Sequence, residues 1–383
     1  MGVVLQYGKT KGQDNLLELL YKMQCEEHRP PTVALEAGPS KMSILMSPGA
    51  QMALASFALM CVNATDGIPT IFSIPTFATM SAPLVDRVHR GLCVDVDGEG
   101  TIPESLRNVL SKWTPDDAKN PKSGIPRILW LNPSCSNPAG VTTSAQRRKE
   151  IYSIAHEYNL LIVEDDPYYY LQENQPRIPS YLSLDVDGRV LRFDSFSKIV
   201  GPGLRCAFVT GPEAIVKKME YAYMQSSQHV CGLSQIIIYK LLKKWGSTGF
   251  EAHIQRVVAF NRERRHCALA MADKWLKGLA EWSVPTGGMY VYLKVYGTGL
   301  KSEELNERLM EAHKVAVVPA SGFYPRGAKL TDVAVLRIST SMADAEVMEK
   351  VMKGLSQVIQ EAKTAYSKQK TDRADIVSSE NCM

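Results

Sequence analysis

A lysine, two serines and an arginine lie close together near the middle of the chain. Lys198 ends the segment DSFSK (residues 194–198), which also contains Ser195 and Ser197, and Arg205 follows shortly after it. Two hydroxyls and a guanidinium can hold a phosphate ester, and a lysine amine forms an imine with an aldehyde. Pyridoxal phosphate carries both groups. Taken alone, a string this short is more often a polar surface loop, so the prediction needs partner residues.

A carboxylate and a tyrosine lie together on a second loop. Asp165 and Tyr168 belong to EDDPYY (residues 164–169), which ends the apolar run at residues 159–164. A carboxylate that keeps the ring nitrogen of pyridoxal phosphate protonated makes the ring an electron sink, and a tyrosine hydroxyl near the phenolic oxygen tunes the imine. An isolated Asp-Asp-Pro would be a turn, but in combination with Lys198 it favours a cofactor site.

Two further polar residues fit the same chemistry. Asn137 lies in NPSCSNPAG (residues 132–140), directly after an apolar run, and its amide could donate to the same phenolic oxygen. Arg337 lies in LRIS (residues 336–339), inside an expected strand, where a buried charge is costly unless it faces an anion. The α-carboxylate of a substrate would satisfy Arg337. A structural salt bridge is the alternative for this arginine.

The elements that must position these residues alternate along the first two thirds of the chain. Apolar runs at residues 127–131 and 159–164 flank a stretch with Ile151, Ile154, Ala155 and Tyr158 at helical spacing. Thr143 with Gln146 resembles a capping box at the start of this helix. Further apolar runs follow at residues 190–193 and 206–210. The alternation predicts a mainly parallel sheet, of the seven-stranded type, flanked by helices.

The pattern changes near residue 271. A glycine-containing apolar run at residues 284–295 precedes an expected helix at 302–313 and short strands at 315–318 and 335–339. A final helix is expected to bury Val347, Val351, Leu355, Val358 and Ile359. The fold class is therefore α/β, with a large domain at residues 1–270, a smaller α+β domain at 271–362, and a disordered tail at 363–383. A cleft between the two domains is the expected active site.

Composition excludes several other classes of protein. The 383 residues are 45% hydrophobic and 22% charged with a net charge of +4, which gives no sign of a nucleic-acid partner. No apolar run approaches the roughly 20 residues needed to span a membrane. The eight cysteines form no C-x-x-C pair, so neither a metal site nor a disulfide framework is expected.

The four segments, in this order, resemble the fold-type-I pyridoxal-phosphate aminotransferases, and in particular the kynurenine/2-aminoadipate (aromatic) branch. The strings EDDPYY, DSFSK and GLAEW (residues 278–282), with Gly288-Met289, are similar to strings of that branch. The resemblance runs from about residue 4 to about residue 361. It implies that Lys198 binds the cofactor and then moves a proton between the substrate Cα and the cofactor. It also implies that Asp165 contacts the ring nitrogen and that Asn137 and Tyr168 contact the phenolic oxygen. Arg337, together with Asn137, would contact the substrate carboxylate.

The resemblance also implies a phosphate site and a second subunit. Ser195, Ser197 and Arg205 would bind the phosphate, together with the turn at residues 47–51 that includes Ala50 and Gln51, where relatives often have a hydroxyl in place of Ala50. Phe77 would cover the cofactor ring. Tyr7 matches a tyrosine that contacts the cofactor phosphate bound in the partner subunit. This match implies a homodimer with the active site at the interface.

The chain departs from the family at its start. Relatives have an N-terminal arm with a Gly-x-Pro stretch ahead of the segment matched by residues 5–7, and this arm closes over the substrate. Ala207 also replaces a glycine that is usual after the phosphate arginine. The chain is therefore expected to be a shortened isoform, an incomplete gene model or a genuine variant, with the substrate lid missing from it.

The resemblance implies transamination of an aromatic amino acid, kynurenine or 2-aminoadipate with 2-oxoglutarate as acceptor, and hence amino-acid and 2-oxo-acid ligands. Two alternatives remain open: β-elimination from cysteine conjugates, and a catalytically silent subunit that pairs with a full-length relative. The cytoplasm is the expected compartment, or the mitochondrion if a targeting segment belongs to a longer form.

Overall fold

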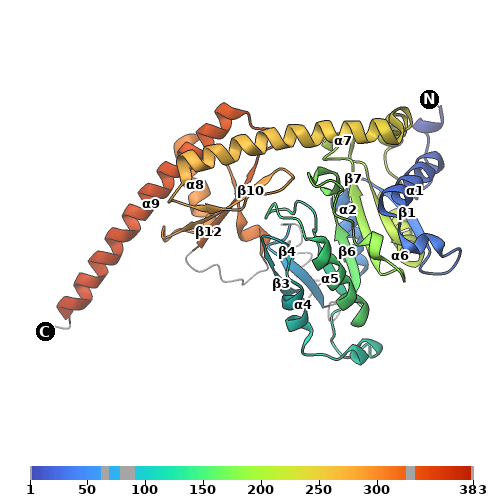
Figure 1. Cartoon of the computed structure of the whole chain (residues 1–383), viewed down its shortest axis with the longest axis horizontal. Coiled ribbons are helices and arrows are strands. Elements are labelled where there is room, and N and C mark those ends of the chain that lie inside the picture. Colours follow the sequence, from blue (N-terminus) through green and yellow to red (C-terminus); the bar gives the residue numbers. More distant parts are fainter. Residues whose placement is uncertain (1, 62–68, 78–90, 325–332, 381–383) are drawn as a thin grey trace.

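The computed structural model describes residues 2–61, 69–77, 91–324 and 333–380. In these residues, two sheets are joined by one long helix (Figure 1). The larger sheet has eight strands in the order β1-β8-β7-β6-β5-β2-β3-β4. These strands are β1 (Met42–Ser47), β2 (Thr70–Ile74), β3 (Gly91–Asp97), β4 (Gly100–Thr101), β5 (Ile128–Leu131), β6 (Leu161–Asp165), β7 (Val190–Ser195) and β8 (Ala207–Pro212).

The centre of the larger sheet is parallel, as the alternating pattern predicted. Strands β3, β2, β5, β6 and β7 pair in parallel, whereas β8 is antiparallel to both β7 and β1, and β4 is antiparallel to β3. The expected sheet type is confirmed, with β4 as an added two-residue edge strand. The helices of this part are α1 (Asp14–His28), α2 (Ala50–Met60), α4 (Pro103–Leu110), α5 (Ala145–Glu157) and α6 (Glu213–Gln225).

Helix α5 connects β5 to β6, as expected for a βαβ unit, and buries Ile151, Ile154 and Ala155 against the sheet. Its predicted start is wrong by one residue. Ser144 is the N-cap, and its hydroxyl accepts from the backbone N–H of Arg147 at 3.4 Å. The hydroxyl of Thr143 instead accepts from the backbone N–H of Thr101 at 3.4 Å.

The smaller sheet has four antiparallel strands in the order β11-β12-β10-β9. They are β9 (Glu281–Trp282), β10 (Tyr290–Tyr296), β11 (Val318–Pro319) and β12 (Val333–Ser339), and helices α8 (Ser302–His313) and α9 (Ala345–Glu380) belong to the same part. The predicted helix at 302–313 is confirmed. Within the apolar run at 284–295, β10 begins at Tyr290, and Gly287 ahead of it forms an isolated antiparallel bridge with Gln172. The strand expected at 315–318 is reduced to β11.

Helix α9 differs from expectation in two respects. Val347 is 48% exposed, although Val351, Leu355, Val358 and Ile359 are buried as predicted. The helix also continues to Glu380, over residues for which the sequence favoured a disordered tail, and its end extends away from the small sheet (Figure 1). Lysine, glutamine and alanine are good helix formers, which explains why the helix continues without apolar periodicity.

Helix α7 (Gly232–Leu276) joins the two parts. It is interrupted at Gly246, whose backbone is not helical, and its second half runs from the large sheet to the small one (Figure 1). Along that half, Ile254 and Val258 belong to the core next to the large sheet, whereas Ala268 and Ala272 belong to the core of the small sheet. None of the helices in the described part of the chain is long and apolar enough to cross a membrane.

Candidate active site

The predicted site residues follow the carboxyl ends of three neighbouring parallel strands. Asn137 lies on the loop after β5, Asp165 is the last residue of β6, and Lys198 lies in the turn after β7. Since β5, β6 and β7 are adjacent and parallel, these loops meet at one edge of the sheet. Ala207 of β8 pairs with both Ser195 of β7 and Ser47 of β1. The turn that follows β1 therefore reaches the same edge of the sheet.

The β5 and β6 loops are held together by Asn132, a residue that sequence reasoning did not single out. Its side-chain amide donates to the backbone carbonyl of Asp165 at 2.5 Å, and its side-chain oxygen accepts from the backbone N–H of Asn137 at 2.7 Å. The only available signal was a polar residue directly after a strand. Asn132 therefore fixes the spacing between two of the predicted ligand residues.

Asn137, Tyr168 and Arg337 form one hydrogen-bonded chain that crosses from the large part to the small part. The side-chain N–H of Asn137 donates to the hydroxyl of Tyr168 at 3.3 Å, and the Arg337 guanidinium donates to the side-chain oxygen of Asn137 at 2.7 Å. Arg337 lies on β12, 200 residues from Asn137. Its Nε is buried and has no hydrogen-bond partner in the described structure, so part of its donor capacity remains for an anion.

The carboxylate of Asp165 is buried, and no hydrogen bond from the described residues ends on it. Burial, with a smaller contribution from the charge of Asp166, raises the pKa of Asp165 to about 7. A cation opposite Asp165 would restore its ionised form. A protonated ring nitrogen fits this position, whereas a neutral neighbour would leave the carboxylate poorly stabilised.

A buried ion cluster that sequence reasoning did not predict lies next to the β6 loop. Arg192 of β7 is fully buried and lies 3.1 Å from Glu164, 3.2 Å from Asp166 and 2.8 Å from Asp194. The hydroxyl of Ser134, on the β5 loop, donates to Asp166 at 2.9 Å. Buried carboxylates of this kind need a partner charge, and Arg192 supplies it to residues of both β6 and β7.

Several groups that are predicted to bind the phosphate lie together at the start of α2 and form a cradle there. Gly49 precedes the helix with a φ of 102°, and a Cβ at this position would lie 2.0 Å from Nη2 of Arg205, so only glycine allows this approach. Nη1 of Arg205 lies 3.4 Å from the Ser197 hydroxyl. The first backbone N–H groups of α2, at Ala50 and Gln51, have no partner inside the helix and can bind an anion.

The remaining predicted residues are Ser195 at the end of β7, Lys198 in the turn after it, and Phe77. Ser195 is buried, and its hydroxyl accepts from the backbone N–H of Ser197 at 3.2 Å. Lys198 is half-buried. Phe77 is half-buried and packs against a cluster that includes Tyr292 and Phe323 of the small part.

Tyr7 lies apart from these residues in the single chain. Its side chain is 84% exposed, and its ring makes an edge-on contact with His229 at 6.0 Å between centroids. The described residues of this chain therefore do not bring Tyr7 into the cradle.

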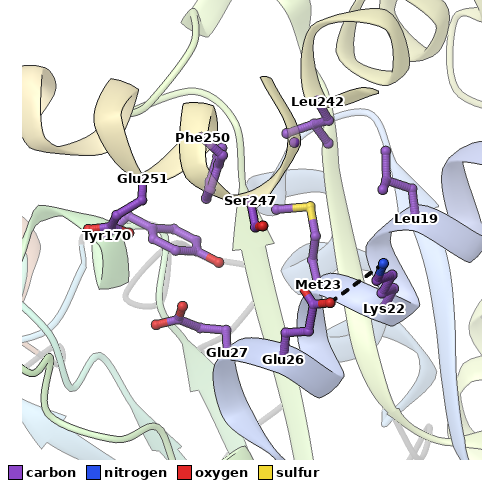
Figure 2. Close-up of a pocket in the computed structure, with 11 residues that line it drawn as sticks. Leu19, Lys22, Met23, Glu26, Glu27, Tyr170, Leu242, Ser247, Phe250 and Glu251 are labelled. Atoms are coloured by element: carbon purple, nitrogen blue, oxygen red, sulfur yellow. Dashed lines mark ion pairs between the residues drawn. The ribbon is translucent and has the colours of Figure 1, made fainter. Parts of the chain in front are cut away.

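A separate cavity of about 330 Å³ lies between α1 and the break in α7, and none of the predicted site residues lines it. Figure 2 shows Met23, Leu242 and Phe250 on one side and Glu27 and Glu251 on another. Arg177 pairs with Glu27 at 3.0 Å and with Glu251 at 2.8 Å. One guanidinium is thus shared by both carboxylates.

A lysine, a buried carboxylate and a phosphate cradle at one sheet edge define a pyridoxal-phosphate enzyme, and comparisons with known proteins agree. The family model for aminotransferase class I and II matches residues 1–355. The chain is 40% identical over 358 residues to the mitochondrial kynurenine/alpha-aminoadipate aminotransferase of Mus musculus, covering 94% of this chain and 83% of that protein. The corresponding Bos taurus protein is 37% identical with the same coverage.

Solved structures show the same fold. The kynurenine aminotransferase of Pyrococcus horikoshii superposes with a TM-score of 0.81 at 27% identity, covering 94% of this chain and 83% of that one. The alpha-aminoadipate aminotransferase of Thermus thermophilus gives 0.80 at 26% identity, covering 94% and 85%. The chain belongs to the class I and II aminotransferases, enzymes that exchange amino groups between amino acids and oxo acids with pyridoxal phosphate as cofactor.

Proposed function

We propose that this enzyme takes the amino group from an aromatic amino acid, kynurenine or 2-aminoadipate and transfers it to 2-oxoglutarate. The observation that carries the proposal is the contact of Arg337 with Asn137 at 2.7 Å. This contact supports the proposal because a guanidinium that could bind a carboxylate lies beside a residue proposed to hold the cofactor. An amino acid and an oxo acid both carry an α-carboxylate, so the same arginine would hold donor and acceptor. The names of the relatives, which include kynurenine, alpha-aminoadipate and aromatic aminotransferases, support the choice of donors.

Each residue of the site has a proposed task. When bound, pyridoxal phosphate supplies an aldehyde that receives the amino group and a ring that accepts an electron pair. Lys198 holds the aldehyde and afterwards, as a free amine, takes a proton from the substrate Cα and returns it to the cofactor side. Asp165 keeps the ring nitrogen protonated, Tyr168 and Asn137 donate to the phenolic oxygen, and Arg337 orients the substrate through its carboxylate.

The phosphate would be held by a separate group of residues. The hydroxyls of Ser195 and Ser197, the guanidinium of Arg205 and the first N–H groups of α2 at Ala50 and Gln51 are its proposed donors. Phe77 is proposed to cover the ring. The compactness of the Gly49 turn supports this assignment, because it allows Arg205 to approach the helix start.

The active form is proposed to be a homodimer in which Tyr7 reaches the phosphate of the partner. The support is that its side chain is 84% exposed and lines a cavity with residues of α1 and α7, so the ring is accessible to a second subunit. The cytoplasm is the proposed compartment, with the mitochondrion as the alternative suggested by the names of the mammalian relatives.

The visible absorption of the purified, cofactor-loaded protein tests the proposal. We expect a band from the lysine-bound cofactor that disappears on addition of kynurenine or 2-aminoadipate and returns on addition of 2-oxoglutarate. Return with pyruvate but not with 2-oxoglutarate would refute the proposed acceptor. A protein that takes up no cofactor, or whose band no donor alters, would refute the proposed function.

A further inference from the structure

Tyr290, the first residue of β10, lies between two groups of the proposed site. Its hydroxyl is 3.1 Å from the hydroxyl of Tyr168, and the two rings meet edge to face with centroids 5.6 Å apart. The guanidinium carbon of Arg337 lies 4.6 Å from the centre of the Tyr290 ring. One buried side chain on the small sheet therefore touches both a proposed cofactor ligand and the proposed carboxylate ligand.

Close backbone contacts fix the position of Tyr290. A Cβ on Gly288, whose φ is 72°, would lie 2.6 Å from the Cβ of Cys135, and a Cβ on Gly287 would lie 2.8 Å from the Cys135 sulfur. On the other side, a Cβ on Gly140 would lie 2.7 Å from the Tyr290 carbonyl oxygen. Three glycines thus let the strand start of β10 sit directly on the loop that carries Asn137.

The hydrogen-bond capacity of Tyr168 sets the direction of its bond with Tyr290. A phenolic hydroxyl has one proton to donate and can accept from other donors. Tyr168 accepts from the Asn137 amide at 3.3 Å. If its own proton goes to the phenolic oxygen of the cofactor, the bond between the two tyrosines must be donated by Tyr290. Among the described residues, the Tyr290 hydroxyl has no other hydrogen-bond partner.

We propose that Tyr290 is a positioning residue with two separable contacts. Its hydroxyl donates to Tyr168 and so strengthens the hydrogen bond that Tyr168 gives to the phenolic oxygen of bound pyridoxal phosphate, while its ring supports the Arg337 guanidinium that grips the substrate carboxylate. The inference rests on the proposed function of Tyr168 and Arg337. It adds a residue through which the small sheet acts on the cofactor.

The two contacts predict different measurable effects. Donors to the phenolic oxygen stabilise the form in which the link between Lys198 and the cofactor has lost its proton, so they lower the pH at which the visible band changes. Loss of the Tyr290 hydroxyl should therefore raise the pH midpoint of this spectral change. The ionisable groups that face the tyrosine pair, Asp165 and Arg337, remain in place in such a variant. Loss of the ring should in addition loosen Arg337 and raise KM.

The experiment compares Tyr290→Phe and Tyr290→Leu with the wild-type holoenzyme. In Tyr290→Phe we expect the midpoint of the spectral titration to rise by about 0.5 to 1 pH unit, the equivalent of one hydrogen bond, with KM for the amino donor within about twofold of wild type. In Tyr290→Leu the midpoint should rise similarly, and KM should rise roughly three- to tenfold as the ring contact with Arg337 is lost.

Tyr292→Phe is the matched control. Tyr292 lies two residues along the same strand, and its hydroxyl is 2.7 Å from that of Tyr324, so this variant also removes a hydrogen bond between two tyrosines. Its midpoint should equal that of wild type. An unshifted midpoint in Tyr290→Phe, or an equal shift in the control, would overturn the inference. The proposed function is tested separately, by whether the visible band of the wild type changes when the amino donor is added. If Tyr290→Leu does not fold, Tyr290→Phe alone still tests the inference.

Discussion

Replacing Asp165 with Asn should change the stability of the cofactor-free protein in a strongly pH-dependent way. The carboxyl group has a pKa of about 7 in the folded chain and an ordinary value of 3.8 when unfolded. Because the folded state binds the proton more tightly, the contribution of Asp165 to stability falls as pH rises from about 4 to about 7. Ionised Asp165 then costs up to about 4 kcal/mol at pH 8, since each pKa unit corresponds to about 1.4 kcal/mol.

The assay is urea unfolding of the cofactor-free wild type and Asp165→Asn at pH 5 and pH 8. At pH 5 the unfolded carboxyl is already largely ionised, so the cost is about 2 kcal/mol, and the advantage of the variant should grow by roughly 2 to 3 kcal/mol between the two pH values. Asp14→Asn, which removes an exposed carboxylate, serves as control for the change in charge. A wild-type to variant difference that does not change with pH would refute the argument about burial.

Loading the protein with cofactor should turn the carboxylate of Asp165 from a destabilising group into a stabilising one. A protonated ring nitrogen beside Asp165 would favour the ionised carboxylate, so the substitution should weaken pyridoxal-phosphate binding. Equilibrium dialysis of both proteins at pH 8 measures this. Equal affinity of the two proteins for the cofactor would refute the proposed contact between Asp165 and the ring nitrogen.

Three further substitutions test other parts of the site. Lys198→Ala should abolish turnover, and retained activity in a steady-state transamination assay would disprove the assigned role of the lysine. Arg337→Ala should raise KM for amino donors roughly tenfold or more by removing the charge-assisted grip on the carboxylate, and an unchanged KM would contradict it. Gly49→Ala should weaken cofactor binding, because the new Cβ would meet Arg205, whereas Gly201→Ala, where nothing lies within 4 Å, should not; fluorescence titration with pyridoxal phosphate compares the two.

The sequence was sufficient to predict the part of the site that follows from strand order. Asn137, Asp165 and Lys198 each come after an apolar run, and parallel strands in a βαβ arrangement bring their ends to one edge. This local logic also predicted most of helix α5. It missed the start at Ser144, because the burial of Thr143 against the β3–β4 hairpin depends on tertiary contact.

Contacts between distant segments could not be predicted in the same way. Arg337 was identified as a buried strand arginine, but its contact with Asn137 depends on how β10 docks through Gly287 and Gly288. Tyr290 resembled any aromatic residue of an apolar run. Arg192 looked like an ordinary strand residue, and only the adjacency of β6 and β7 reveals that it pairs with buried carboxylates from both strands.

The long helix α7 has a consequence for how the molecule melts. Its second half is roughly 45 Å long and contributes Ile254 and Val258 to one core and Ala268 and Ala272 to the other. If either core came apart alone, half of this helix would lose its packing while remaining attached to the intact half. Separate melting is therefore disfavoured, and calorimetry should record a single cooperative transition although the described residues form two sheets.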